Sequence, residues 1–177
     1  AGDALTDADY NVALGYDSLA IDTLGSRAVA LGYGALSTQN FTSATDNYNV
    51  AVGFSAGNSI TTGILNTLIG GLAGDAMTDA DENVAVGYNA LTANLKGNRT
   101  VAIGNGALMA QTFSSITDSY NTAVGHFAGG SVTTGVQNTL IGGLAGDAIT
   151  TGNYNTALGY NSGSGITTGT FNTTLGI

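Results

Sequence analysis

A short pattern of residues recurs along the whole chain: usually Asn, a β-branched residue, usually Ala, an aliphatic residue and then Gly. The β-branched and aliphatic positions lie two residues apart, which is the period of a β-strand and not of a helix. We therefore predict one short strand in each copy, followed by a bend at the glycine, which tolerates unusual backbone angles. The ten motif glycines are Gly15, Gly32, Gly53, Gly70, Gly87, Gly104, Gly125, Gly142, Gly159 and Gly176.

The copies follow one another at regular intervals. The motif glycines keep a 17-residue period, as from Gly70 to Gly87, except for two 21-residue intervals that end at Gly53 and Gly125. The whole arrangement forms a 72-residue superrepeat, in which the segment 70–76 recurs unchanged at 142–148. Short fixed periods are typical of solenoids, in which each unit stacks on its neighbours. We predict a single repeat domain over 1–177 and, because the chain starts and stops within the pattern, a piece of a longer fibre.

Stacked units of this kind predict an all-β fold, a parallel β-solenoid. Ten coils at a strand spacing of about 4.8 Å would form a rod of roughly 48 Å. A second strand is expected in many units, at segments such as 60–63, 132–135 and 166–169. Asn stands four residues before the motif glycine in eight copies, where the side chains can form an amide ladder along the rod. These residues are Asn11, Asn49, Asn66, Asn83, Asn121, Asn138, Asn155 and Asn172.

The same columns suggest how the rod is packed. A 17-residue coil is expected to enclose a thin line of Val, Leu and Ile side chains, while the small residue between them lets another layer approach the opposite face. Further apolar surface would then be covered by several identical chains packed around one axis. The pattern therefore predicts a homo-oligomer, without fixing the number of chains.

Composition and charge narrow the choice of partners. The chain has 28 Gly, no Pro, Cys or Trp, and a formal net charge of −9, with only Arg27, Lys96 and Arg99 as fixed cations. Such a chain cannot neutralise a row of phosphates, so we expect no nucleic-acid partner and no polybasic attachment to membranes. Its longest apolar runs, such as 67–72, are far below the roughly 18 residues of a membrane-spanning helix. This segment is therefore not expected to insert into a membrane.

One column of the repeat is rich in aromatic residues. The residue after the motif glycine is Tyr16, Tyr33, Phe54, Tyr88 or Tyr160 in five copies, and the only histidine, His126, falls in the same column. With one histidine and no cysteine, we expect no enzymatic activity. The rings can pack on one another along the rod or offer flat faces to sugars. The candidate ligand-binding residues are Tyr16, Tyr33, Tyr88 and Tyr160.

Two further surface patterns have alternative explanations. Acidic turns place Asp7 beside Asp9 and Asp79 beside Asp81, and closely spaced carboxylates suit Ca²⁺. Asp and Thr are also ordinary turn residues, so we expect no cofactor and keep calcium as the alternative. Paired threonines could form a flat hydroxyl array of the kind an ice-binding solenoid needs, although Thr is also a good strand residue. The pairs are 61–62, 133–134, 150–151 and 167–168.

The repeat also resembles a known family. Segments 49–53, 83–91 and 121–125 resemble the head repeats of YadA-like trimeric autotransporter adhesins and the similar repeats of bacteriophage tail fibres. The resemblance implies a left-handed parallel β-roll, a homotrimeric rod, and an extracellular place on a virion fibre or a bacterial cell surface. The adhesin repeat is usually shorter than the 17-residue unit of this chain, and we expect longer outer loops around Phe41 and Phe113 here.

The leading hypothesis is a non-enzymatic fibre segment that carries attachment to a host or another surface, through a glycan or protein receptor. The alternative is a self-assembling extracellular structural filament without a receptor. An ice- or calcium-binding solenoid is the third possibility.

Overall fold

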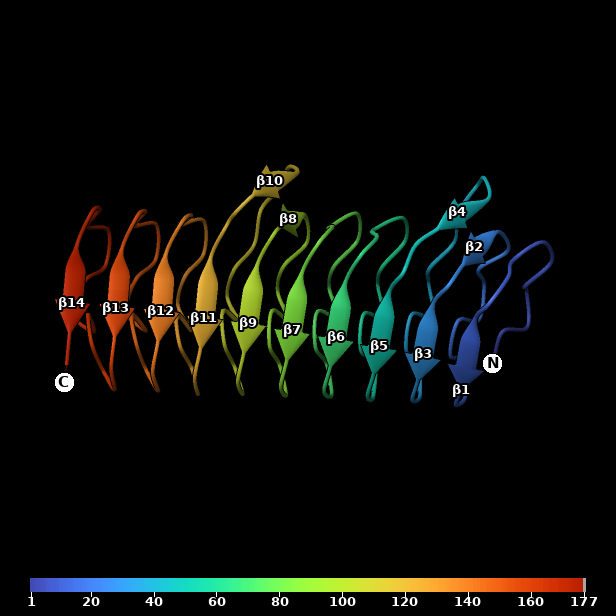
Figure 1. Cartoon of the computed structure of the whole chain (residues 1–177), viewed down its shortest axis with the longest axis horizontal. Coiled ribbons are helices and arrows are strands. Elements are labelled where there is room, and N and C mark those ends of the chain that lie inside the picture. Colours follow the sequence, from blue (N-terminus) through green and yellow to red (C-terminus); the bar gives the residue numbers. More distant parts are fainter. Residues whose placement is uncertain (177) are drawn as a thin grey trace.

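The chain folds into a single row of stacked coils. The computed structural model describes residues 1–176 and contains strands but no helix within them. The main sheet has ten strands, and Figure 1 shows them side by side along the long axis, with the N-terminus at one end and the C-terminus at the other. They are β1 (Val12–Leu14), β3 (Val29–Leu31), β5 (Val50–Val52), β6 (Thr67–Ile69), β7 (Val84–Val86), β9 (Val101–Ile103), β11 (Thr122–Val124), β12 (Thr139–Ile141), β13 (Thr156–Leu158) and β14 (Thr173–Leu175).

These ten strands form one parallel sheet in which every strand pairs with the corresponding residues of the next coil. Val12 lies opposite Val29, for example, and Val84 lies opposite Val101. The predicted all-β parallel β-solenoid is therefore confirmed, and its strands are those expected from the motif. The remaining strands form two short parallel pairs beside the row, β2 (Gly25–Ser26) with β4 (Thr45–Asp46) and β8 (Gly97–Asn98) with β10 (Thr117–Asp118).

The second strand that was expected in many units does not form at the segments given for it. The backbone bends at 60–63, 132–135 and 166–169 instead. In the first of these segments, Thr61 and Gly63 both donate their backbone N–H groups to the carbonyl of Thr78, at 3.0 and 3.2 Å. An evenly spaced parallel ladder does not share one carbonyl between two donors in this way, so the chain turns there.

The sheet is oriented opposite to the sequence-based prediction. The middle residue of each strand points into the coil, so that Ala51, Leu68 and Ala85 are fully buried, whereas the aliphatic residue after it lies outside. Leu14 is 69% exposed and Leu158 is 45% exposed, so the predicted inner line of Val, Leu and Ile is wrong. The interior of such a short coil is narrow, and a column of mostly alanine at the centre of the strand fits it.

Leucine and glycine share one column of the core, each in runs of neighbouring coils. The fourth residue after the motif glycine is Leu in four coils, and these coils carry a polar residue three positions later. Where the fourth residue is Gly, the residue three positions later is apolar, as Ile60 is after Gly57. Leu68 fills the remaining space, because a Cβ added at Gly57 or Gly74 would lie 2.7 or 2.9 Å from its methyl groups. A Leu at the middle of the strand thus occupies space that the two neighbouring glycines leave free.

The motif glycine is required where the backbones of neighbouring coils meet. Gly87 has φ +136°, and a Cβ added there would lie 2.5 Å from the carbonyl oxygen of Gly104 in the next coil. The other motif glycines through Gly142 show the same close approach, with φ between 129° and 141°. A side chain at this position is excluded by both the angle and the space.

The asparagine column forms a buried ladder of hydrogen bonds between coils. The backbone N–H of Asn66 donates to Oδ1 of Asn49 at 3.0 Å, and its own Nδ2 donates to the carbonyl of Ala80 at 2.7 Å. The same bonds join Asn83 to Asn66. A second run follows one superrepeat later, through Asn121, Asn138, Asn155 and Asn172.

The ladder is interrupted before each of the two longer intervals, where Ala28 and Thr100 replace Asn. Buried glutamines close these interruptions, because Oε1 of Gln39 accepts from Asn49 Nδ2 and Oε1 of Gln111 accepts from Asn121 Nδ2, both at 2.8 Å. The four extra residues of each long interval form the protrusions that carry β4 and β10 in Figure 1.

The two long loops are anchored by the phenylalanines at which they begin. Phe41 and Phe113 are only 5% and 6% exposed. A Cβ added at Gly25 would lie 2.7 Å from the Phe41 ring, and one at Gly97 would lie 2.8 Å from the Phe113 ring. The loops therefore project from the coil, as expected, but their aromatic residues belong to the packed interior.

Candidate functional site

The outer face of the ten-stranded sheet carries a continuous column of aliphatic side chains along the row of coils. We define this outer face as the first and third residue of each strand, since only the middle residue points inward. The third position is aliphatic in every coil, and Val12, Leu14, Ile69, Ile103, Ile141, Leu158 and Leu175 are all exposed. Contiguous exposed apolar surface of this extent is characteristic of a protein interface.

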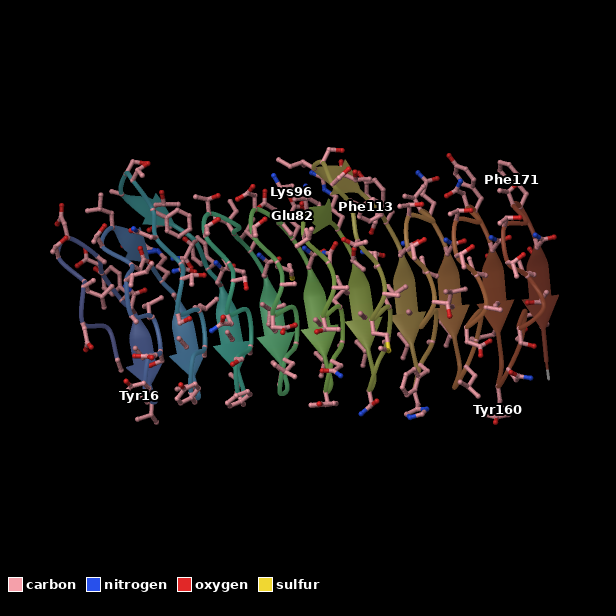
Figure 2. All side chains as sticks on the ribbon, turned by 180° about the vertical axis from the view of Figure 1, so that it is seen from behind. Tyr16, Glu82, Lys96, Phe113, Tyr160 and Phe171 are labelled. Atoms are coloured by element: carbon pink, nitrogen blue, oxygen red, sulfur yellow. The ribbon has the colours of Figure 1, made fainter. Side chains whose placement is uncertain are left out.

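One long border of the outer face carries the predicted aromatic column, which we call the aromatic edge. It consists of the residue after each motif glycine from Tyr16 to Tyr160, and Figure 2 shows these two residues on the same side of the row. Tyr33 is stacked between Tyr16 and Phe54, with ring centroids 5.5 and 5.4 Å apart. The candidate residues Tyr16, Tyr33, Tyr88 and Tyr160 are all exposed.

Glycine interrupts the aromatic edge twice, at Gly71 and Gly143. The ring of the following coil lies against each glycine: Tyr88 Cδ2 is 3.5 Å from the place of a Cβ on Gly71, and Tyr160 Cδ2 is 3.4 Å from that on Gly143. No ring atom of the preceding coil comes within 4 Å of either point. We call these interruptions the Gly71 gap and the Gly143 gap.

The opposite border of the outer face is a second column that sequence reasoning missed. Figure 2 shows Glu82 and Phe171 on this side, and we call it the mixed edge because its residue types differ from coil to coil. All of its members adopt a left-handed backbone with φ between 49° and 65°, which is uncommon for residues other than glycine. They are Tyr10, Arg27, Tyr48, Leu65, Glu82, Arg99, Tyr120, Gln137, Tyr154 and Phe171. Their fixed distance of five residues before each motif glycine was the available signal.

The cations of the chain are held in place on the mixed-edge side. The guanidinium carbon of Arg27 lies 5.2 Å from the ring centre of Tyr10 and 5.7 Å from that of Tyr48, and its Nε is 3.2 Å from Asp46. Arg99 pairs with Glu82 and Asp118. Its hydrogen bonds to Glu82 and then Tyr120 raise the pKa of Arg99 above its ordinary value. This edge therefore presents ordered rows of rings and ion pairs.

Two of the four candidate calcium ligands already have partners. The carboxylate of Asp79 accepts hydrogen bonds from Thr61 and Thr62 and lies 3.3 Å from Lys96 Nζ. Burial raises the pKa of Asp79, but these hydrogen bonds and the charge of Lys96 outweigh it, so that the pKa lies below its ordinary value. The Oδ1 atom of Asp81 accepts the backbone N–H of Ile64 at 2.8 Å.

The other two candidates lie in the first turn, where the N–H of Asp9 donates to Ser26 Oγ and the N–H of Asp7 donates to the carbonyl of Thr23. Among residues 1–176, no group of three or more acidic or histidine side chains could surround a metal ion. The structure thus brings neither Asp7 and Asp9 nor Asp79 and Asp81 together with a third ligand of this kind.

Replacing Asp81 by Asn is expected to stabilise the chain slightly at neutral pH. Burial, with the charges of Glu82 and Asp79, raises the pKa of Asp81 above 3.8, so ionisation costs the folded state more than the unfolded one. Asn keeps the acceptor for Ile64 and occurs in the same column at Asn98 and Asn153. Solvent screening limits the gain to less than about 1 kcal/mol.

This gain should appear above the raised pKa of Asp81 and vanish as the pH falls through that pKa and past 3.8, where both states are protonated. Thermal melting of both proteins between pH 3 and 7 tests this. Equal melting temperatures at pH 7, or a larger difference at pH 3, would contradict it.

Several hydroxyls of the threonine pairs are used in hydrogen bonds between coils. The first threonine of each of three pairs, Thr61, Thr133 and Thr150, donates its hydroxyl to the backbone carbonyl of the next coil at 3.2–3.3 Å. These hydroxyls therefore help to join the coils and are not left as donors for ordered water.

Comparison with protein-family models, curated proteins and solved structures found no match to this chain. The part of the chain that the structure describes contains no helix long and apolar enough to cross a membrane. No pocket was found within residues 1–176.

His126 is exposed on the aromatic edge and meets Phe127 edge-on, with ring centroids 4.5 Å apart. The surfaces that remain as candidates for function are the outer face and its two edges.

Proposed function

We propose that the chain is a non-enzymatic segment of an extracellular fibre, in which identical copies pack their outer faces together and form a rigid rod that serves attachment to a host or another surface. The observation that supports this is the outer face, whose third strand position is an exposed or half-buried aliphatic residue in all ten coils and whose first position is Val in five coils and Thr in the other five. Burying such a face removes a long apolar strip from water, and apolar burial is the main driving force of association. The aromatic edge and the mixed edge, which border this face, add further exposed rings along the same side of the rod.

A trimer is the assembly we propose. The number three rests on the resemblance of the repeat to the head repeats of trimeric adhesins and to tail-fibre repeats. Three copies around one axis would direct each outer face inward and leave the projecting loops at β4 and β10 outside. The loops can then vary without disturbing the coils. The same resemblance supports a location on a virion fibre or a bacterial cell surface.

The association can be tested by placing charges on the outer face. Ile69 and Ile103 are 40% and 37% exposed in the single chain, so Ile69→Glu with Ile103→Glu should leave the coil intact but introduce unpaired charges into the interface. We expect the mass measured by light scattering to fall to that of one chain, 17.5 kDa, with an unchanged circular dichroism spectrum.

The matched control places the same two charges elsewhere. Ser114→Glu with Thr168→Glu changes exposed residues outside the outer face and should leave the assembly unchanged. If the control dissociates as readily as the Ile69 and Ile103 variant, or if neither does, the outer face is not the interface.

A further inference from the structure

We propose that the Gly71 gap and the Gly143 gap each bind one sugar ring of a neutral oligosaccharide, held between the aromatic side chains on either side. This inference rests on the proposed attachment function and names the ligand class and the site. The first gap lies between Phe54 and Tyr88, and the second lies between His126 and Tyr160.

The fold itself does not require glycine at these two positions. Unlike the motif glycines, Gly71 and Gly143 have φ values outside the left-handed region, and an added Cβ would make ordinary contacts of 3.5 and 3.4 Å. Tyr or Phe occupies the same column at Tyr16, Tyr33 and Phe54. The missing side chains therefore leave a place in the column that the backbone would allow a ring to fill.

The width of each gap matches one ring. Neighbouring rings of the intact column lie 5.4–5.5 Å apart. Phe54 and Tyr88 belong to coils two steps apart, or about 10 Å at the usual strand spacing. One further ring between them would restore the spacing of the column. The free part of the gap is on the Phe54 side, because the Tyr88 ring already lies against Gly71 whereas no atom of Phe54 lies within 4 Å of the added Cβ position.

A sugar ring suits the chemistry of this place better than an anion does. Pyranose rings have apolar C–H faces that stack on aromatic rings and hydroxyl groups around their rim. The formal net charge of −9 disfavours acidic polysaccharides. Asn89 lies beside the first gap: its N–H donates to the carbonyl of Gly71 at 3.1 Å, and its buried side-chain Oδ1 has no hydrogen-bond partner in the described chain.

The two gaps also favour a repeating ligand. They lie on the same edge, one superrepeat apart, and the four coil-to-coil steps from one to the other span about 19 Å along the rod. Asn161 repeats the bond of Asn89, with its N–H 2.9 Å from the carbonyl of Gly143. An oligosaccharide long enough to reach both gaps could bind the two equivalent sites at once, and the second contact would increase its affinity.

Filling the gaps tests this proposal. The double variant Gly71→Tyr and Gly143→Tyr should continue the ring column and keep the melting temperature of the parent. Binding is measured by saturation-transfer NMR with neutral hexasaccharides of glucose, mannose, galactose and N-acetylglucosamine. We expect at least one of them to receive saturation at its ring C–H protons from the parent protein, and the signal to fall at least tenfold in the double variant.

Two controls make the result specific. Asn105→Tyr adds a ring to the same column outside both gaps, between the wall residues Tyr88 and His126, and should retain binding. Phe54→Ala removes one wall of the first gap and should weaken binding. The proposal is overturned if no hexasaccharide binds the parent, or if the double variant binds as well as the parent. It is also overturned if filling the gaps lowers the mass of the assembly, because a neighbouring copy would then occupy them. A rod of unchanged mass that binds no sugar would leave the fibre proposal standing.

Discussion

Replacing Gly87 by Ala is expected to destabilise the chain by about 4 kcal/mol or more, near the upper limit for single substitutions. The added Cβ would lie 2.5 Å from the carbonyl oxygen of Gly104, and the φ of +136° is one that residues with side chains rarely adopt. The neighbouring coils cannot move apart without breaking the strand pairing on both sides of β7. Stacked coils depend on their neighbours, so the damage should extend beyond one unit.

The matched control is Gly71→Ala, one coil away. Its added Cβ meets only the Tyr88 ring, at 3.5 Å, and its backbone is not left-handed. This variant should stay within about 0.5 kcal/mol of the parent, as surface substitutions usually do. Urea unfolding of both proteins, followed by circular dichroism, gives the comparison. Equal losses of stability would mean that the motif glycine is not required by the contact between coils.

Replacing Asn138 by Ala is the second change with a large expected effect, a loss of about 3 kcal/mol. The Oδ1 atom of Asn138 accepts from the backbone N–H and Nδ2 of Asn155, at 2.9 and 3.1 Å. Its Nδ2 donates to the carbonyl of Gly152 at 2.9 Å. Alanine would leave the N–H of Asn155 and the carbonyl of Gly152 buried without these partners. Unsatisfied buried groups cost more than the net value of the bonds themselves.

Asn105→Ala is the control for the ladder, because this exposed asparagine makes no side-chain hydrogen bond within residues 1–176. Hydrogen exchange adds a local readout, since the amide of Asn155 should exchange faster in the Asn138 variant than in the parent. An Asn138 variant as stable as the Asn105 variant would contradict the role of the ladder.

Much of the fold follows from spacing alone. The 17-residue interval between motif glycines correctly predicts which residues pair between strands, because parallel in-register stacking places equivalent residues opposite one another. The recurring Asn likewise indicates the ladder. The inward face could not be chosen in the same way, because Val, Ala and Leu are all apolar and a period of two fits either orientation. Ala85 is buried and its neighbours are partly exposed because the coil is narrow, and the width of the coil cannot be predicted from the local sequence pattern.

The candidate site shows the same division. The aromatic edge was predicted because its residues are similar, whereas the mixed edge was missed because Arg27, Tyr48 and Leu65 share a backbone conformation and not a chemical type. The acidic pairs seemed to be possible metal ligands in sequence, yet Asp79 lies beside Lys96 from the next coil. Contacts between coils decide the role of a surface residue in this fold, and they become visible only when the register is known.

The proposed fibre function depends most on association of the outer faces. The projecting loops, the two edges and the glycine gaps are features of a single chain. The proposed rod also requires that other copies of the chain cover the apolar outer face. Sedimentation equilibrium of the unmodified chain measures this directly. The account predicts a mass three times the 17.5 kDa of one chain, maintained on dilution to low micromolar concentration. A mass of 17.5 kDa at every concentration would contradict it.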